Sequence, residues 1–188
     1  ARAETRTARL QFRQDSYTIL PEFRNNRAEL DTVSNSILLV KRNGDVEITG
    51  IYITGYASPE GSEAHNLVLS ENRAKALAAA IKVHDSLWES GTLSYDMSQY
   101  EIARTYFQWL CDHCRYDNAA ADDSASHLAY GALVSGLAVC DGYTGAYNLL
   151  LKLEGIECTS LFNDSHIWTL ATLDGTQYHI DVTWGDQY

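Results

Sequence analysis

The sequence has few prolines and cysteines, and no dense group of cations. Two prolines stand against twelve tyrosines and four tryptophans in 188 residues, which argues against a disordered chain. The net charge is −11 and the 14 Lys and Arg residues form no run. Because a nucleic-acid backbone is bound by clustered cations, this composition predicts no nucleic-acid partner. No apolar run approaches the roughly 20 residues that cross a bilayer, so no transmembrane segment is expected.

Four cysteines are too few for a disulfide framework, and they do not form the two close pairs of an all-cysteine zinc site. They are Cys111, Cys114, Cys140 and Cys158. The cluster around residues 111–114 holds two cysteines and one histidine on an expected helix, which is typical of core or surface thiols. We therefore expect neither a metal nor a cofactor.

The first half is predicted to run strand, helix, strand, helix. Residues 7–14 and 46–56 have β-type patterns, and Gly50 shifts the second one as a bulge would. Asn25 or Asn26 can cap the first helix, and Ser62 opens a second helical stretch rich in helix formers that could continue to Trp88.

The second half combines helices with a run of three strands, which gives an α+β fold class. Apolar residues at helical spacing, with Gly155 as a stop signal, mark the helices. The expected helices are 97–114, 127–134 and 140–153, and the expected strands are 156–162, 166–173 and 176–184.

Cys140 stands at the start of a predicted helix, with small residues after it. A thiol at this position meets the positive end of the helix dipole and unpaired backbone N–H groups, both of which favour the nucleophilic thiolate. The neighbouring charge of Asp141 opposes thiolate formation. By itself this pattern is also typical of a buried, inert cysteine.

A hairpin gives Cys140 a catalytic context. The Asp-Gly pair at 174–175 is a strong signal for a two-residue loop, so that residues whose numbers sum to 349 face each other. Trp168 then faces Asp181, and His166 faces Thr183. His166 and Asp181 therefore share a face as diagonal neighbours, about 6–8 Å apart between backbones, which a hydrogen bond can bridge.

We expect Cys140 to be a nucleophile, His166 its base and Asp181 the group that orients the base. His179 is a rival base, because it lies on the same face two residues before Asp181. His166 is favoured since it opens its strand, closer to a cleft edge. A register slip of one residue would place His166 and Asp181 on opposite faces.

These residues lie in motifs that resemble the transglutaminase-like superfamily in its bacterial form, over residues 83–188. The motifs are AVCDGY at 138–143, GI at 155–156, SHIW at 165–168 and HIDVTW at 179–184. The resemblance implies a papain-like α+β fold and thiol attack on an amide carbonyl of a peptide or protein. The resulting thioester would pass to water, as in a protease or amidohydrolase, or to an amine, as in an acyltransferase.

The oxyanion hole is only partly defined by the sequence. The Cys140 backbone N–H is the natural first donor. Tyr130 or Tyr116 could supply the second donor, although both are also typical of core aromatics. Trp168 and Tyr143 could line the acyl cleft or pack in the core.

Residues 7–82 resemble, incompletely, the OmpA-like peptidoglycan-associating domain. The likeness rests on GYASPEGS at 55–62, then Asn66, Leu69-Ser70 and Arg73-Ala74. Arg73 occupies the position of an arginine that grips the wall peptide, whereas Ser58 replaces the family's aspartate and the final strand is lacking.

Together the two resemblances predict an OmpA-like segment at 1–82 and a catalytic domain at 83–188. They imply a bacterial envelope or secreted location, and no signal segment opens the chain. The alternative to an enzyme is a non-catalytic module that binds peptidoglycan or has a structural role.

Overall fold

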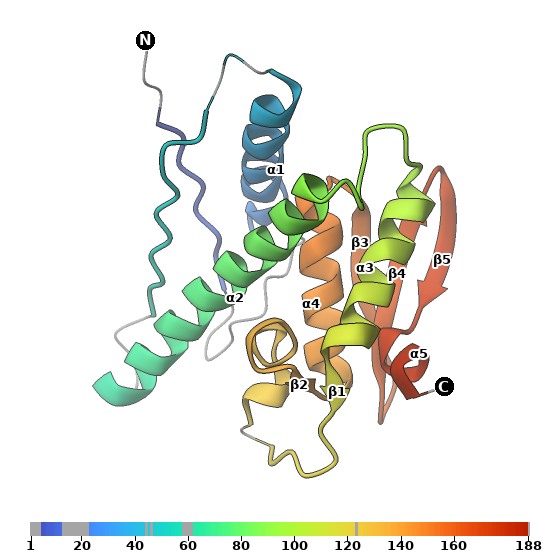
Figure 1. Cartoon of the computed structure of the whole chain (residues 1–188). Helices are drawn as coiled ribbons and strands as arrows, with labels where there is room; N and C mark the ends of the chain where they lie inside the picture. Colours follow the sequence, from blue (N-terminus) through green and yellow to red (C-terminus); the bar gives the residue numbers. More distant parts are fainter. Residues whose placement is uncertain are drawn as a thin grey trace.

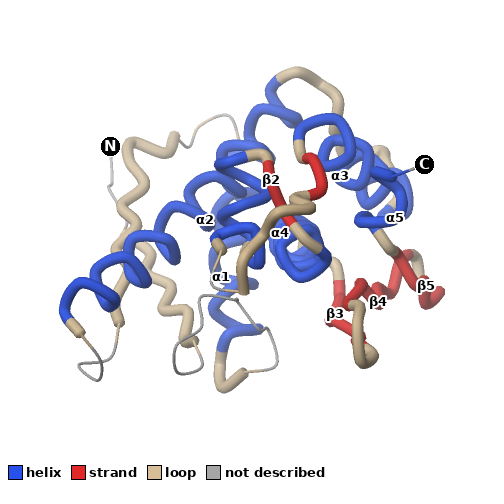
Figure 2. The backbone as a smooth tube through the Cα atoms, turned by 90° about the horizontal axis from the view of Figure 1, so that it is seen from below, coloured by secondary structure: helices blue, strands red, loops and turns tan. Residues whose placement is uncertain are grey.

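The computed structural model of the chain describes residues 5–12, 23–43, 45, 47–57, 62–122 and 124–187. Helix α4 (Cys140–Leu153) stands at the centre, with α1 (Asn26–Arg42) and α2 (Glu63–Glu89) on one side. Helix α3 (Gln99–His113) and a small antiparallel sheet lie on the other side (Figure 1). Figure 2 looks almost along α4 and shows the other elements arranged around it.

Helix α4 has the bounds that the sequence predicts, and its side chains are buried nearly all round. Tyr143, Tyr147 and Leu150 are at most 1% exposed, and both tyrosine hydroxyls have partners. A helix that is apolar on every face has to be enclosed by other elements. The core of the protein is therefore built around α4.

Two of the surrounding helices begin at side-chain caps, whereas Asn25 makes no capping hydrogen bond through its side chain at the start of α1. Ser98 and Glu101 form a reciprocal capping box at the start of α3, and Ser62 caps α2 through the backbone N–H of His65. Helix α1 places Leu30 and Ile37 in the core, as its apolar stripe predicts. Helices α1 to α4 confirm the long helices that the sequence predicts, including the stop after α2 near Gly91.

The sheet order is β3 (Glu157–Phe162), β4 (Ile167–Leu173) and β5 (Thr176–Ile180). Leu173 faces Thr176 and Thr169 faces Ile180, so the predicted register is confirmed. Asp174 and the following glycine have φ angles of 50° and 82°, the left-handed conformation that such a turn requires.

The expected strand at 176–184 is too long. β5 ends at Ile180, and Val182–Gln187 form the short helix α5. Asp181 causes the change, because its carboxylate accepts a hydrogen bond from Trp184 N at 3.1 Å and so caps the new helix. The expected pairing of His166 with Thr183 is accordingly wrong.

The expected helix at 127–134 is found in part. Residues 129–135 are helical and include the π-helix η2 (Gly131–Ser135), while η1 (Ala125–His127) is a separate 3-10 helix. The two-residue parallel strands β1 (Arg115–Tyr116) and β2 (Leu137–Ala138) lie close by. A Cβ on Gly131 would be 2.4 Å from the Ala125 carbonyl oxygen, so η2 packs closely against η1.

The strands expected in the first half are not found in the described residues 5–12 and 47–57. Small sheets need at least three strands or a covering helix to be stable, and the sequence lacks the last strand of the resembled domain. Helix α2 also runs without interruption past residue 82. The domain border there, and the OmpA-like identity of the segment, stay predictions.

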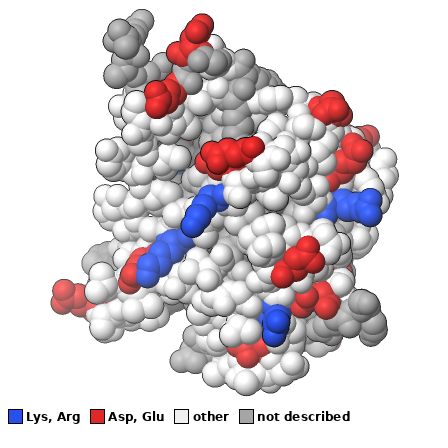
Figure 3. Space-filling model, viewed as in Figure 1, with Lys and Arg blue, Asp and Glu red and all other residues white. Residues whose placement is uncertain are grey.

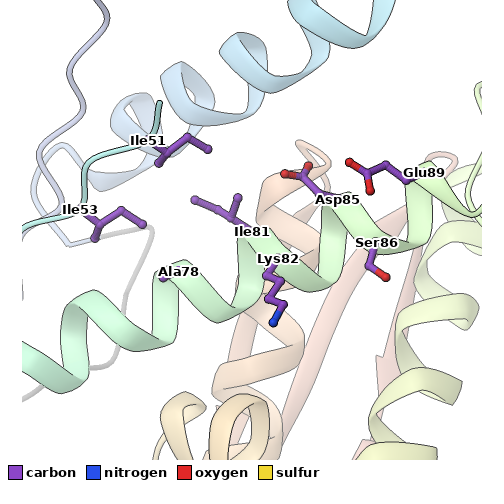
Figure 4. A pocket seen from close by; sticks show the side chains of 8 residues that line it. All are labelled: Ile51, Ile53, Ala78, Ile81, Lys82, Asp85, Ser86 and Glu89. Atoms are coloured by element: carbon purple, nitrogen blue, oxygen red, sulfur yellow. The ribbon is translucent and has the colours of Figure 1, made fainter. Parts of the chain in front are cut away.

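A hollow of about 540 Å³ lies between this extended segment and α2 (Figure 4). Ile51 and Ile53 line one side, and Ile81, Lys82 and Asp85 of α2 line the other. It contains none of the predicted catalytic residues. Figure 3 shows acidic and basic side chains dispersed over one face of the molecule.

A buried carboxylate joins three helices. Glu154, with a side chain 3% exposed, lies directly after α4 and accepts hydrogen bonds from Tyr106 (2.6 Å) and Trp88 (2.9 Å). His84 Nε2 of α2 lies 3.1 Å from the same oxygen. Burial favours a raised pKa for Glu154, but these three partners outweigh it and lower the pKa. The carboxylate therefore stays ionised inside the protein.

Replacement of Tyr106 by Phe is expected to lower the free energy of unfolding by about 2 kcal/mol, because a hydrogen bond to a charged acceptor is lost. Tyr147→Phe is the matched control, since this equally buried hydroxyl donates to the neutral carbonyl of Ala103 and should cost about 1 kcal/mol. Urea denaturation measures both. Equal losses would show that the charge of Glu154 contributes nothing.

Candidate active site

Cys140 is held at the start of α4 by backbone hydrogen bonds to two loops. Asp117 N donates to the carbonyl of Ala138, and Val139 N donates to the carbonyl of Ser126, both at 2.9 Å. A Cβ on Gly142 would lie 2.2 Å from the Ser126 carbonyl oxygen, so only glycine fits in this first helical turn. The backbone before and after the sulfur therefore has little freedom.

His166 and Asp181 form the hydrogen bond that the hairpin register predicts. His166 Nε2 lies 2.6 Å from Asp181 Oδ2, and the two side chains are 17% and 22% exposed. The His166 ring also stacks nearly parallel to Trp184, with centroids 5.4 Å apart, and to Trp168 at 6.0 Å. The imidazole is thus oriented by a carboxylate and by aromatic faces.

The start of β4 brings this pair to Cys140. The backbone N–H of Ile167, the residue after His166, lowers the pKa of the Cys140 thiol. Thr144, one turn further along α4, donates from Oγ1 to the Ile167 carbonyl at 3.1 Å. Ile167 is therefore bound to the first turn of α4, which brings the preceding residue, His166, to the end of α4 that carries Cys140.

The electrostatic environment of Cys140 contains opposing contributions. Burial is the largest and raises the pKa of the thiol, the Ile167 N–H lowers the pKa, and the charge of Asp141 raises it again. The backbone N–H groups of Cys140 and Asp141 lower the pKa further, as expected at a helix start, but the net direction is upward. A base is therefore needed to activate this sulfur near neutral pH.

His179 is engaged elsewhere. Its Nδ1 accepts a hydrogen bond from the Trp168 indole at 2.9 Å, and the residue is exposed on β5. Asp181 pairs with His166, so the two histidines that the sequence left in competition have separate partners.

The two candidate tyrosines also differ. Burial raises the pKa of Tyr116, and a charged Cys140 sulfur would raise it further. In β1, Tyr116 pairs with Ala138, two residues before Cys140. The Tyr130 ring lies 6.0 Å from Lys75 Nζ of α2.

The comparisons with known proteins relate part of the chain to one family. Residues 88–180 match the family model of the Transglutaminase-like superfamily. They form a transglutaminase-like domain. The superfamily includes cysteine peptidases and acyltransferases, and its members are typically enzymes.

Two curated relatives carry the name kyphoscoliosis peptidase. The human protein is 28% identical over 103 residues, which cover 45% of this chain and 16% of the human protein. The mouse protein is 27% identical over 130 residues, 58% of this chain and 20% of the mouse protein. This chain thus spans a fifth or less of these relatives. A crystal structure of a TGase aligns with 85% of this chain and 38% of its own, at 15% identity and a TM-score of 0.47.

Two features of the transglutaminase-like domain were not expected from the sequence. One is the hydrogen bond from Thr144 of α4 to the Ile167 carbonyl at the start of β4. The other is a hydrogen bond between His127 of η1 and Asp141 of α4. Both join segments that are far apart in the sequence, so no spacing rule could reveal them.

The predicted peptidoglycan site lies in the N-terminal half. Arg73 is 7% exposed, donates to the Tyr56 carbonyl at 2.6 Å and stacks over the Phe12 ring at 4.2 Å. These contacts bind its guanidinium within the protein, while Ser58 lies outside the described residues. Peptidoglycan binding by these two residues stays a prediction without support.

The described part of the chain contains no group of three His, Cys, Asp or Glu residues that could hold a metal ion. Cys111 and Cys114 have no disulfide partner, and burial raises the pKa of Cys111 to about 11. Among the same residues, no helix is long and apolar enough to span a bilayer.

Thr144→Val keeps the shape of the side chain but removes the hydrogen bond to Ile167. We expect a loss of about 1 kcal/mol in unfolding free energy, and alkylation of Cys140 that is about two- to threefold slower at pH 7, because the Ile167 N–H moves away from the sulfur. Thr144→Ser retains the hydroxyl and should stay close to the parent protein. Iodoacetamide labelling mapped by mass spectrometry measures the rate. Equal rates in both variants would show that the hydrogen bond from Thr144 to Ile167 does not affect the reactivity of Cys140.

Proposed function

We propose that the protein is a cysteine-dependent enzyme that cleaves or transfers the acyl group of peptide or glutamine-type amides, with Cys140, His166 and Asp181 as its catalytic triad. The observation that supports it most directly is the 2.6 Å hydrogen bond between His166 and Asp181, next to Ile167, whose carbonyl binds Thr144 in the first turn of α4. The membership of residues 88–180 in a superfamily of cysteine peptidases and acyltransferases supports this proposal.

In the first step His166 accepts the thiol proton through Nδ1, since Nε2 is bound to Asp181. The sulfur attacks the amide carbonyl, and Asp181 stabilises the imidazolium that forms. General-base activation at the moment of attack suits a thiol whose pKa is raised by burial. The tetrahedral intermediate then collapses, His166 returns the proton to the leaving amine or ammonia, and a thioester remains on Cys140.

In the second step the thioester is attacked by water, which gives a carboxylic acid, or by an amine, which gives a new amide. His166 removes a proton from either nucleophile and returns it to the departing sulfur. The name peptidase of the two curated relatives favours water. The oxyanion formed in each step is bound by the Cys140 backbone N–H, and Tyr116 is our candidate for the second donor.

Turnover is tested with unfolded casein and glutamine-containing peptides, by following new amino termini, ammonia and incorporation of a primary amine. Cys140→Ala should abolish all three. Asp181→Asn should reduce kcat by about 100-fold or more, because the imidazolium loses its counter-charge. Its stability should be retained, since Asn caps a helix as well as Asp does.

Asp181→Ala loses both functions of the side chain and should also cost about 1 kcal/mol in unfolding free energy. Asp164→Asn is the matched control, because this exposed carboxylate lies two residues before His166 and has no role in the proposal. Full activity of Asp181→Asn would remove the carboxylate from the mechanism.

Tyr116→Phe should lower kcat by about 10- to 100-fold with little change in KM, because an oxyanion donor acts mainly in the transition state. Tyr130→Phe removes the hydroxyl of the other candidate and should have little effect. Steady-state kinetics of the two variants separates them. A large loss of kcat in Tyr130→Phe with little loss in Tyr116→Phe would assign the second oxyanion donor to Tyr130 instead.

A further inference from the structure

We propose that His127 is a positioning residue for the nucleophile: by hydrogen bonding to the carboxylate of Asp141, it sets the reactivity of the adjacent Cys140 sulfur. This inference deepens the proposed function and rests on it, because it concerns the same sulfur. It assigns a role to a histidine outside the triad.

The contact between the two side chains is close and two-pronged. His127 Nδ1 lies 2.9 Å from Asp141 Oδ2 and 3.1 Å from Oδ1, and the side chains are 31% and 41% exposed. The backbone N–H of Gly142 also donates to Oδ1 at 3.1 Å. Two donors therefore hold the carboxylate in one orientation next to the nucleophile.

The position of His127 is fixed independently of this contact. It ends η1, where Ser124 caps the turn through the backbone N–H of Ser126 at 3.1 Å. The Ser126 hydroxyl donates to Asp117 at 2.5 Å, and its carbonyl accepts from Val139 N. The turn that carries His127 is thus bound to the residue immediately before Cys140.

The charge of Asp141 works against the reaction, because a negative group beside the sulfur disfavours the thiolate. The effect is present in this structure, where Asp141 raises the pKa of the Cys140 thiol. A hydrogen-bond donor on the carboxylate withdraws part of that charge from the sulfur, and a protonated imidazole offsets more of it. His127 therefore counteracts the one charge that hinders activation.

The other groups considered near the sulfur do not offset the charge of Asp141. His166 is the base and is committed to Asp181, and Tyr116 carries no positive charge. The carboxylate of Asp117 accepts a hydrogen bond from Ser126. Because the His127–Asp141 pair is partly exposed, solvent screens it and the expected effect is moderate.

The test compares the rate at which iodoacetamide alkylates Cys140 in His127→Ala, Asp141→Asn and the double variant, at pH 6 to 10, with each thiol mapped by mass spectrometry. At pH 7 we expect His127→Ala to react about two- to threefold more slowly and Asp141→Asn about two- to threefold faster. The double variant should match Asp141→Asn, because His127 acts only through that carboxylate.

His65→Ala, a histidine replacement in the first turn of α2, is the control and should leave the rate unchanged. Unchanged alkylation in His127→Ala would overturn the proposal. The proposal would also be overturned if His127→Ala slowed the alkylation of Cys140 equally in the parent protein and in Asp141→Asn. That result would indicate a purely structural role of His127. Alkylation needs no substrate, so a failure here is distinct from a lack of turnover.

Discussion

The site depends on the enclosure of α4. This helix is buried on nearly every face, so its first residue has no freedom to move relative to the elements packed around it. Two loops bind the backbone before Cys140, and Thr144 binds the start of β4 to the first helical turn. The bonded pair of His166 and Asp181 is thereby held at the end of the sheet that contacts the first turn of α4. Such rigid support by the core is what a pre-organised reaction site requires.

Asp181 has two functions in this arrangement. One carboxylate oxygen binds His166, and the other caps α5. Asp181 thus orients His166 and also ends β5. Since α5 begins within the hydrogen-bonding reach of Asp181, Trp184 of that helix comes to lie against the His166 ring. The position of His166 is therefore coupled to the folding of the chain beyond β5.

The N-terminal half is connected to the transglutaminase-like domain through α2. This helix contributes Ile81 and Val83 to the common core, and His84 to the buried cluster around Glu154. Arg73 of the same helix binds two extended segments through Tyr56 and Phe12. Through these contacts α2 supports α4. No observation on the described residues favours a role of α2 in binding the cell wall.

The sequence by itself determined the long helices, the hairpin register and the pairing of His166 with Asp181. These follow from local rules: caps, apolar periodicity, and an Asp-Gly turn that fixes which residues face each other. Tertiary structure decided the form of residues 125–135, the absence of strands in the described residues 5–12 and 47–57, and the contacts of His127 and Thr144. The contacts of His127 and Thr144 depend on which group from another segment lies within about 3 Å, such as the Ile167 carbonyl beside Thr144, and neighbouring residues carry no information about that.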